Sequence, residues 1–427
     1  MENILVLGVG AQGSTVAKRL NDHPDVKKIT CADYDQRAVD AIVRDLDKAE
    51  GHRVDARKRE DIAQLASGVD LVVDALPTQF GQNAIEAALE VEASYQGFTV
   101  FDRPAAGADG KEPEWTESFD AVFGPYHEKF EAIGKTALVS TGSAPGVINV
   151  VVRDAMRELE SCETINMLVY EGVQAKKFFP FWWSPVVAYG DMVENPYNLV
   201  DGKIEAVEPF GGMVEREVRG VEGARKFFDH LHDEAILVGM HPEVHLGCKN
   251  AAFKYGGVGV DWARMLYDMD MLSTSPRVVD GKEIIPFDMM VALTRPAPKY
   301  HDEIATILEE GLESDTGAML VEAYGTTADS RKVMVETYVM APGCVDAFER
   351  SGLTGETYLT GQGGYLFTEL LVEGTIQQIG AMGPDQLTME QVDLYLEKAE
   401  ALDITLETQV IEQTPGSPGY LMCGPGV

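Results

Sequence analysis

Three glycines near the N-terminus have the spacing of a loop that holds a dinucleotide. Gly8, Gly10 and Gly13 follow directly on the apolar run of residues 3–7, and a helix-forming stretch comes after them. In this pattern the first glycine permits a sharp turn, the second lets the backbone approach a pyrophosphate, and the third lets the helix pack closely on the strand. The unpaired N–H groups at the start of the helix then point at the phosphates. The spacing therefore predicts a strand, a glycine loop and a helix that bind a dinucleotide.

An acidic residue stands where the ribose of such a dinucleotide is expected. Asp33 lies about 20 residues after Gly13, at the end of a second apolar run. A carboxylate there accepts hydrogen bonds from a ribose 2′-hydroxyl group and repels a 2′-phosphate. Asp33 therefore favours NAD over NADP as the cofactor.

The elements that must position these residues alternate along the first 140 residues. Helix-like segments separate strand-like runs at residues 4–8, 28–34, 52–56, 69–77, 93–100 and 136–142. Strands separated by helices of about 10 residues are typical of parallel βαβ units with right-handed crossovers. We expect an α/β fold with an N-terminal Rossmann-type, doubly wound parallel sheet, whose ligand lies at the carboxyl ends of the strands.

The pattern changes after about residue 150, which indicates a second domain. Helix-like segments at 146–159 and 260–272 accompany strand-like runs at 163–172, 204–210, 234–248 and 333–341. They favour a second α/β domain with a mixed or antiparallel sheet over residues 149–355. The run Thr360–Gly364 is typical of a loop that opens a helix. We expect this helix, within about residues 356–400, to return to the first domain of residues 1–148.

Composition and charge exclude several classes of partner. The 427 residues are 45% hydrophobic and 25% charged, as in a globular protein of about two domains. A net charge of −35, from 70 acidic against 35 basic residues, argues against binding to nucleic acid or to an anionic membrane. No apolar stretch approaches the roughly 20 residues of a membrane helix, and the start lacks the basic region of a signal peptide. A cytoplasmic location is expected.

Neither the cysteines nor the histidines form a strong metal-binding pattern. The five cysteines are widely spaced and unpaired, which favours reduced thiols. Four histidines fall between residues 230 and 245, and the i,i+2 pair His230 and His232 could share one face of a strand. No neighbouring cysteine or acid completes a signature, so we expect ordinary surface or interface histidines and no metal. One of them is also a candidate general acid or base.

Several further segments resemble those of the saccharopine dehydrogenase family. The stretch VSTGSAPGVINVVV is similar to the family's Gly-x-Ala-Pro-Gly-x-x-Asn junction, here with Asn149 as its asparagine, and KYGGVGVDWARMLYDMDML and TGQGGYLFTELLVEG follow in the family's order. Within the family, enzymes of the L-lysine 6-dehydrogenase type look most similar. The resemblance implies NAD-dependent hydride transfer at a carbon–nitrogen centre of an amino acid. It also implies a homodimer or a larger homo-oligomer.

The resemblance assigns cofactor-binding residues at the ends of the first four strands. They are Gly8, Gly10, Ala11, Gln12 and Gly13 in the loop, Asp33 at the ribose, Asp55 and Ala56 at the adenine, and Ala75, Leu76 and Pro77 at the nicotinamide ribose. For Asp55, a role as a helix cap or loop residue is the alternative.

Three residues are the implied catalytic groups. Asn149 is expected either to contact the nicotinamide or substrate, or to be a buried capping amide. Lys254 and Tyr255 match a basic–aromatic pair of the family. A cation there would pair with a substrate carboxylate, and the tyrosine would donate a hydrogen bond or relay a proton. A structural role is the alternative for each of these two side chains.

The dense aromatic cluster Phe178–Trp183 favours a core or a subunit interface, with the wall of a substrate site as the alternative. The substrate is a small molecule, and three functions stay open. The first is a lysine 6-dehydrogenase or a saccharopine-type enzyme. The second is a carboxyalkyl-polyamine dehydrogenase. The third is an inactive NAD-binding sensor or assembly protein, because Tyr255–Val258 departs from the family's Tyr-Pro-Gly-His segment.

Overall fold

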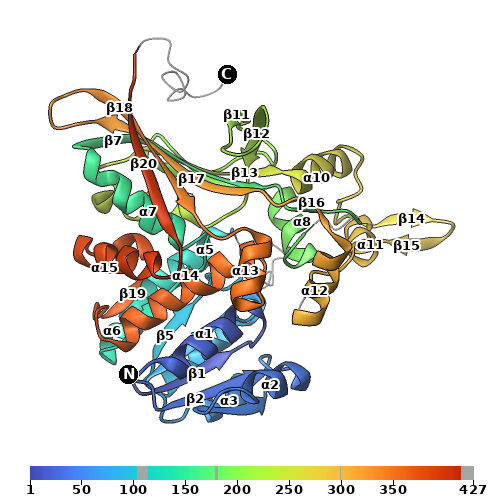
Figure 1. Ribbon diagram of the computed structural model, residues 1–427, viewed down its shortest axis with the longest axis vertical. Coiled ribbons are helices and arrows are strands. Elements are labelled where there is room, and N and C mark those ends of the chain that lie inside the picture. Colours follow the sequence, from blue (N-terminus) through green and yellow to red (C-terminus); the bar gives the residue numbers. More distant parts are fainter. Residues whose placement is uncertain (103–113, 178–180, 299, 415–427) are drawn as a thin grey trace. The chain divides into compact units, whose positions relative to one another are not determined.

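The computed structural model describes residues 1–102, 114–177, 181–298 and 300–414 (Figure 1). The chain forms two compact units. The described residues within Met1–Val150 and Thr357–Leu402 form the first unit, and those within Val151–Glu356 and 403–414 form the second.

The described residues of the first unit form one parallel sheet of seven strands. Their order across the sheet is β3–β2–β1–β4–β5–β6–β19, and every pairing is parallel. The strands are β1 (Asn3–Leu7), β2 (Lys28–Asp33), β3 (Ala49–Arg53), β4 (Leu71–Asp74), β5 (Ser94–Gly97), β6 (Thr136–Leu138) and β19 (Gly380–Met382). The first six have the order of a doubly wound dinucleotide-binding fold. The predicted Rossmann-type sheet is confirmed.

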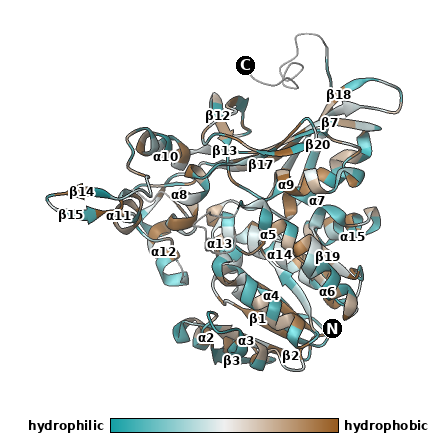
Figure 2. Ribbon diagram, turned by 180° about the vertical axis from the view of Figure 1, so that it is seen from behind, coloured by the Kyte–Doolittle hydropathy of each residue, from teal (hydrophilic) through white to brown (hydrophobic). Residues whose placement is uncertain are grey.

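In α1 and α4 the buried residues recur at helical spacing. In α1 the residues Gly13, Val16, Ala17 and Leu20 are buried, which places them on one face. Figure 2 shows hydrophilic and hydrophobic residues alternating along α4 in the same way. The helices that lie wholly or partly in this unit are α1 (Ala11–Asp22), α2 (Gln36–Val43), α3 (Arg59–Leu65), α4 (Gly81–Glu90), α5 (Thr116–Ala121), α6 (His127–Ala132), α7 (Val147–Ala155), α14 (Gly355–Val372) and α15 (Met389–Glu400).

The run Thr360–Gly364 lies inside α14, so the predicted loop at the start of this helix is wrong. Its glycines serve close packing. A Cβ atom at Gly364 would lie 2.4 Å from the ring of Phe98, and one at Gly361 would lie 3.0 Å from the side chain of Thr15. After α14 the chain adds β19 beside β6 at the edge of the sheet.

The second unit is built on a mixed sheet, which in the described residues has nine strands. The path β10–β9–β13–β7–β17–β18–β20 is extended by β12 beside β13 and by β11 beside β12. Only the β13–β7 pairing is parallel among those described. The strands are β7 (Ser161–Glu171), β9 (Tyr197–Val200), β10 (Lys203–Ala206), β11 (Val214–Glu217), β12 (Ala224–Asp229), β13 (Asn250–Gly257), β17 (Gly317–Thr326), β18 (Lys332–Met340) and β20 (Thr405–Glu412). The predicted mixed-sheet architecture is confirmed.

Shorter elements surround this sheet. Two small ladders pair β8 (Gln174–Ala175) with β16 (Leu312–Ser314), and β14 (Arg277–Val279) with β15 (Lys282–Ile284). The helices are α8 (Pro185–Val193), α9 (Glu234–Met240), α10 (Val258–Asp268), α11 (Pro286–Leu293), α12 (His301–Glu310) and α13 (Cys344–Ser351). On one face of the sheet, Leu168 and Tyr170 of β7 pack with Phe227 of the β11–β12 hairpin.

The strand predicted over residues 234–248 is wrong, because residues 234–240 form α9. Five consecutive residues of this helix, from Glu234 to Val238, are buried. A continuous buried run has no polar face, so its pattern does not separate a helix from a strand.

No helix among the described residues combines the length and the apolarity that a membrane span requires. In the same part of the chain the four cysteines are free thiols and are buried: Cys31, Cys162, Cys248 and Cys344. Cys423 lies outside the described residues.

Candidate functional site

The glycine loop has the geometry that its spacing predicts. Gly8 has a φ of 77°, and a Cβ atom on it would lie 2.6 Å from the carbonyl oxygen of Ala75. A Cβ atom on Gly13 would lie 1.9 Å from the carbonyl oxygen of Gly8, so α1 packs directly against the loop. Gly10, the residue before α1, has no atom within 4 Å of such a Cβ. The N-terminus of α1 therefore has open space beside it, which fits a pyrophosphate.

Asp33 connects the second strand to this loop. One carboxylate oxygen accepts a hydrogen bond from the N–H group of Val9 (2.9 Å), and the other accepts one from the N–H group of Asp35 (2.8 Å). Ala11 and Gln12 form the first turn of α1 and are half-buried. Asp33 thus lies beside the loop, and each of its oxygens can still accept a ribose hydroxyl group.

At the end of the third strand, Asp55 is held by a basic neighbour. Both of its carboxylate oxygens accept hydrogen bonds from the guanidinium group of Arg57, at 2.8 and 2.7 Å. These bonds lower the pKa of Asp55 to about 2. The residue directly before α3 is Lys58, so Asp55 is a loop residue rather than its cap. Ala56 is buried, and its carbonyl oxygen accepts a hydrogen bond from the side chain of Asn83 (2.9 Å).

Asp74, at the end of β4, shapes the loop that carries Ala75, Leu76 and Pro77. Its carboxylate accepts hydrogen bonds from the N–H group of Leu76 (2.9 Å) and the hydroxyl group of Tyr95 (2.8 Å). Ala75 and Leu76 are half-buried, whereas Pro77 is exposed. The sequence patterns did not point to Asp74, although its place directly before the predicted ribose contacts was a usable signal. Burial raises the pKa of Asp74 to about 6.

This raised pKa predicts a dependence of stability on pH. The native state binds the proton more tightly than the unfolded chain, in which the pKa is about 3.9. The contribution of Asp74 to the free energy of unfolding is therefore complete below pH 4 and is lost as the pH rises through 6. Between pH 5.5 and 7.5 the free energy of unfolding should fall by about 1 kcal/mol from this group. Asp74→Asn should lack this loss. Urea unfolding of both proteins across this pH range measures the loss. If the free energy of unfolding falls equally with pH in both proteins, the raised pKa does not belong to Asp74.

Asn149, in α7, makes the contact of a capping amide. Its side-chain oxygen accepts a hydrogen bond from the N–H group of Gly146 (2.9 Å), and the residue is completely buried. Its amide nitrogen has no hydrogen-bond partner among the described residues. A buried donor without a partner is costly, so this nitrogen fits a contact to a bound group.

Lys254 and Tyr255 lie on opposite faces of the second sheet, because they are consecutive residues of β13. The ammonium group of Lys254 is buried, pairs with the carboxylate of Asp229, and donates a hydrogen bond to the carbonyl oxygen of Gly212 (2.7 Å). The predicted pairing of this cation with a substrate carboxylate is therefore not favoured, because Asp229 already neutralises it.

Tyr255 faces a group of aromatic and titratable side chains. Its ring stacks on that of His230, with centroids 4.8 Å apart, and meets the ring of Trp183 edge-on at 6.0 Å. Burial, followed by the nearby carboxylates of Glu171 and Asp191, raises the pKa of Tyr255 well above its usual value. The phenol therefore stays protonated and is a hydrogen-bond donor. Of the aromatic cluster, Phe181 and Trp182 are buried, Trp183 is half-buried, and Phe178 and Phe179 lie outside the described residues.

Glu171, the last residue of β7, is a carboxylate on the same face. It pairs with Gly257 in the parallel ladder, so it points to the side on which Tyr255 lies. Burial and the carboxylates of Glu356 and Asp315 raise the pKa of Glu171 to about 8. The sequence patterns did not point to Glu171, because the pairing of β7 with β13 had to be known first.

The departure at Tyr255–Val258 has a structural reason. A Cβ atom on Gly256 would lie 2.5 Å from the carbonyl oxygen of Lys226, and one on Gly257 would lie 2.0 Å from that of Glu171. Gly257 also has a φ of 128°. The two glycines let the strands on either side approach β13 at the candidate site.

Three further groups complete this region: Asp191 of α8, and His230 and His232 between β12 and α9. Burial raises the pKa of Asp191 to about 7 and lowers that of His230. Burial also opposes the charge of His232, but Glu234, Asp191 and Asp233 outweigh it and raise the pKa to about 9.

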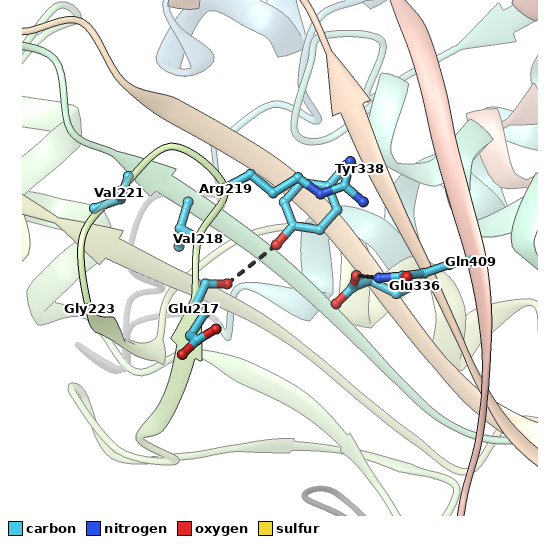
Figure 3. A pocket seen from close by; sticks show the side chains of 8 residues that line it. All are labelled: Glu217, Val218, Arg219, Val221, Gly223, Glu336, Tyr338 and Gln409. Atoms are coloured by element: carbon cyan, nitrogen blue, oxygen red, sulfur yellow. Dashed lines mark hydrogen bonds between the residues drawn. The ribbon is translucent and has the colours of Figure 1, made fainter.

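A separate hollow of about 500 Å³ lies among β11, β18 and β20 and contains none of the predicted site residues (Figure 3). The guanidinium group of Arg219 lies 4.1 Å from the ring centroid of Tyr338 and pairs with Glu407. The hydroxyl group of Tyr338 donates to the carbonyl oxygen of Glu217 (3.4 Å). Because its polar groups pair with one another, this hollow is not the candidate site.

Comparison with known proteins shows which families and folds this chain resembles. Residues 4–138 match the family model of the saccharopine dehydrogenase NADP binding domain. A carboxynorspermidine synthase of Vibrio alginolyticus is 25% identical over 319 residues, which cover 70% of this chain and 74% of that protein. The carboxynorspermidine synthase of Vibrio cholerae is 24% identical over 319 residues, which cover 70% and 75%.

Two solved structures share the fold. Saccharopine dehydrogenase (L-Glu forming) of Saccharomyces cerevisiae matches with a TM-score of 0.67 at 14% identity, over 96% of this chain and 100% of that one. Homospermidine synthase of Legionella pneumophila, in complex with NAD, matches with a TM-score of 0.65 at 12% identity, over 98% and 94%. Residues 4–138 are therefore similar to the NADP binding domain of saccharopine dehydrogenases, and the chain shares the fold of these two structures.

Proposed function

We propose that this protein is an NAD(P)H-dependent reductase that joins a primary amine of a polyamine to an aldehyde-bearing amino acid. The amine and the aldehyde condense to an imine with loss of water. One hydride and one proton then reduce the imine to a secondary amine, and NAD(P)⁺ is released. The relatives named as carboxynorspermidine synthases support this function over the oxidation of lysine.

The observation that carries the proposal is that Glu171 and the aromatic side chain of Tyr255 lie on the same face of the second sheet. Trp183 and Tyr255 meet edge-on at 6.0 Å, and Glu171 lies on the Tyr255 side of the sheet. An alkylammonium group is recognised by a carboxylate and by the faces of aromatic rings. The cation of Lys254 is paired with Asp229 and lies on the opposite face of β13, so we assign the Tyr255 face to the amine partner and not to the carboxylate of the amino acid.

The residues have separable roles in this reaction. Glu171 binds the cationic amine in its ionised form and, in its protonated form, can return a proton to the reacting nitrogen. Tyr255 stays protonated, so its hydroxyl group can donate a hydrogen bond to the substrate. In the first unit, the glycine loop and Asp33 would hold the cofactor, and the free amide N–H group of Asn149 would donate to it. The cofactor supplies the hydride when it is bound.

We propose NAD as the preferred cofactor, because the carboxylate of Asp33 lies beside the glycine loop. Asp33→Asn removes the charge and keeps a hydrogen-bond acceptor. The affinity for NAD should fall roughly 10- to 100-fold, since a hydrogen bond to a charged group is worth about 1.5–3 kcal/mol. Fluorescence titration of NAD and NADP measures this.

The matched control is Asp40→Asn, on the exposed side of α2, which should leave both affinities unchanged. If the unaltered protein prefers NADP and Asp33→Asn binds NAD as before, the cofactor assignment is wrong.

The function is tested by following the absorbance of NAD(P)H with a panel of substrates. Diamines such as 1,3-diaminopropane and putrescine are offered together with aldehydes that carry an amino-acid carboxylate. Consumption of NAD(P)H that requires both the diamine and the aldehyde supports the proposal. Reduction of NAD(P)⁺ by lysine or saccharopine alone would replace it with an amino-acid dehydrogenase. Inactivity in every arm, with measurable cofactor binding, would favour a nucleotide-binding protein without catalysis.

A further inference from the structure

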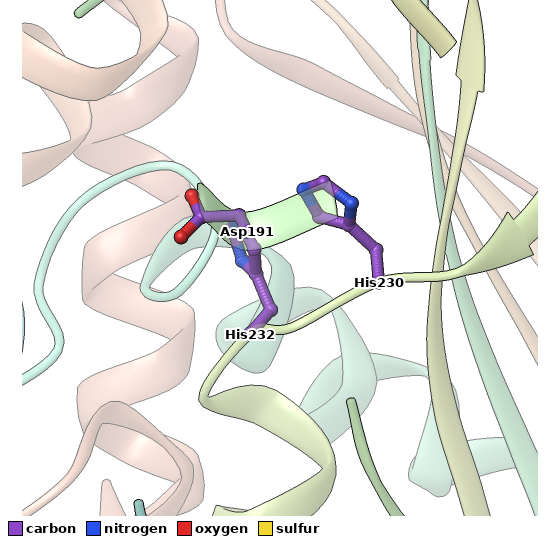
Figure 4. Close-up of side chains that lie close together, drawn as sticks. All are labelled: Asp191, His230 and His232. Atoms are coloured by element: carbon purple, nitrogen blue, oxygen red, sulfur yellow. The ribbon is translucent and has the colours of Figure 1, made fainter. Parts of the chain in front are cut away.

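Asp191, His230 and His232 bring three ligating atoms together. Each side chain offers one nitrogen or oxygen atom, and the three atoms lie within 4.8 Å of one another. The side chains come from α8 and from the segment between β12 and α9 and lie close together (Figure 4). Because Asp191 is about 40 residues before the histidines, the sequence did not show this group, and no metal was expected there.

The two imidazole rings are held in place by aromatic rings of β13. The ring of His232 stacks on Phe253, with centroids 4.1 Å apart and an angle of 7° between the planes. The ring of His230 stacks on Tyr255 at 4.8 Å and 21°. In addition, the N–H group of Leu231 donates a hydrogen bond to the carbonyl oxygen of Asp191 (3.1 Å), which ties α8 to the segment with the histidines. Such fixed rings are preorganised for a ligand.

The carboxylate of Glu234 orients the ring of His232 from the side opposite to the proposed metal ion. Nδ1 of His232 lies 3.2 Å from Oε2 of Glu234, a residue that is completely buried. Since Nδ1 faces this carboxylate, Nε2 is the ring nitrogen that can lose its proton to an incoming metal ion. Metal-binding histidines usually donate their second ring N–H to a carboxylate in this way.

The other two groups have no hydrogen-bond partner within the described residues. The imidazole of His230 is 5% exposed, and neither of its ring nitrogens makes a hydrogen bond to a described residue. The carboxylate of Asp191 likewise accepts none from the described part of the chain. The described residues therefore leave both groups able to ligate an ion.

We propose that Asp191, His230 and His232 bind one divalent transition-metal ion, of which Zn²⁺ is the type. Two imidazole nitrogens and one carboxylate oxygen are ligands that Zn²⁺ accepts, with a fourth position left for water. Ligand atoms around Zn²⁺ lie about 3.4 Å apart in a tetrahedron of 2.1 Å bonds, so closing the site needs shifts of about 1 Å. Through the stacking on Tyr255, the metal would fix the ring that faces the candidate site.

A second cluster of histidine and acidic residues could also hold a metal ion by composition, but its environment differs. His23, Glu369 and Glu373 also bring ligating atoms within 4.8 Å. There the ammonium group of Lys398 already lies 3.4 Å from Glu369 and 3.0 Å from Glu373. A cation of the chain itself occupies that position, so we propose no metal there.

The test uses the full chain purified without a polyhistidine tag and stripped with a chelator. Equilibrium dialysis against Zn²⁺, followed by elemental analysis, should find one bound ion per chain, and bound Co²⁺ should show visible absorption. His232→Asn and Asp191→Asn should each weaken binding at least 100-fold. Glu234→Gln, which leaves all three ligands in place, should weaken it about 10-fold.

His23→Asn is the matched control and should still bind one ion. Circular dichroism and cofactor titration show whether each variant is folded, and Asp191→Asn is the variant that best preserves volume. The proposal is overturned if the stripped protein binds no Zn²⁺, or if a folded His230→Asn/His232→Asn double variant binds as much as the unaltered chain. Because the readout is bound metal, this result does not depend on the proposed reaction.

Discussion

Replacing Gly13 with alanine is expected to weaken NAD(P) binding by roughly 100-fold and to destabilise the first unit. The added Cβ atom would lie 1.9 Å from the carbonyl oxygen of Gly8, which is a backbone atom and cannot move without shifting α1 from β1. Overpacking of this kind costs up to about 3 kcal/mol. We expect the melting temperature to fall by about 10 °C. Differential scanning fluorimetry and cofactor titration measure the two effects.

Gly10→Ala is the matched control for this prediction. No atom lies within 4 Å of a Cβ at this position, so the melting temperature should not change. The same Cβ would enter the space in which we expect the pyrophosphate, so cofactor affinity should still fall. Equal affinities for Gly10→Ala and the unaltered chain would show that the pyrophosphate does not lie beside this residue.

Glu171→Gln is expected to lower kcat/KM for the amine by about 100-fold, because a charge-assisted contact and a general acid–base group are both removed. The pKa of Glu171 is raised to about 8, so the carboxylate forms as the pH rises towards 8. In the unaltered enzyme kcat/KM should therefore increase from pH 6 to pH 8. The variant should lack this increase. Initial rates across this pH range measure it.

Glu163→Gln, an exposed change on the same strand, is the matched control and should leave kcat/KM unchanged. The fold should survive Glu171→Gln, because the raised pKa means that ionisation of this carboxyl group is unfavourable in the native protein. If the folded variant keeps full activity and the same pH profile, Glu171 does not bind the amine.

The geometry of the glycine loop could be predicted because it depends on residues that are close in the sequence. Gly8, Gly10, Gly13 and Asp33 act within one βαβ unit, so their spacing along the chain reflects their arrangement in space. The alternation of strands and helices likewise indicated the parallel sheet. By contrast, β19 joins this sheet after more than 200 intervening residues, and no local pattern reveals such a pairing.

The candidate amine site depends on contacts between strands that are far apart in the sequence, and no sequence pattern indicates these contacts. Glu171 and Tyr255 come together only through the register of β7 against β13. The family resemblance pointed to Tyr255, but it also pointed to Lys254, which the alternation of the strand turns to the opposite face. The error at α9 had another cause, since a fully buried helix has no polar side to reveal its period.

Transfer of deuterium tests the central claim most directly. The protein is given NAD(P)H that carries deuterium at C4, in either configuration, together with a diamine and an aldehyde-bearing amino acid. With one of the two labelled cofactors we predict a secondary amine one mass unit heavier, with the deuterium on the carbon next to the new nitrogen, and with the other an unlabelled amine. Bound cofactor that transfers no deuterium to any pair of amine and aldehyde would contradict reduction at a carbon–nitrogen centre.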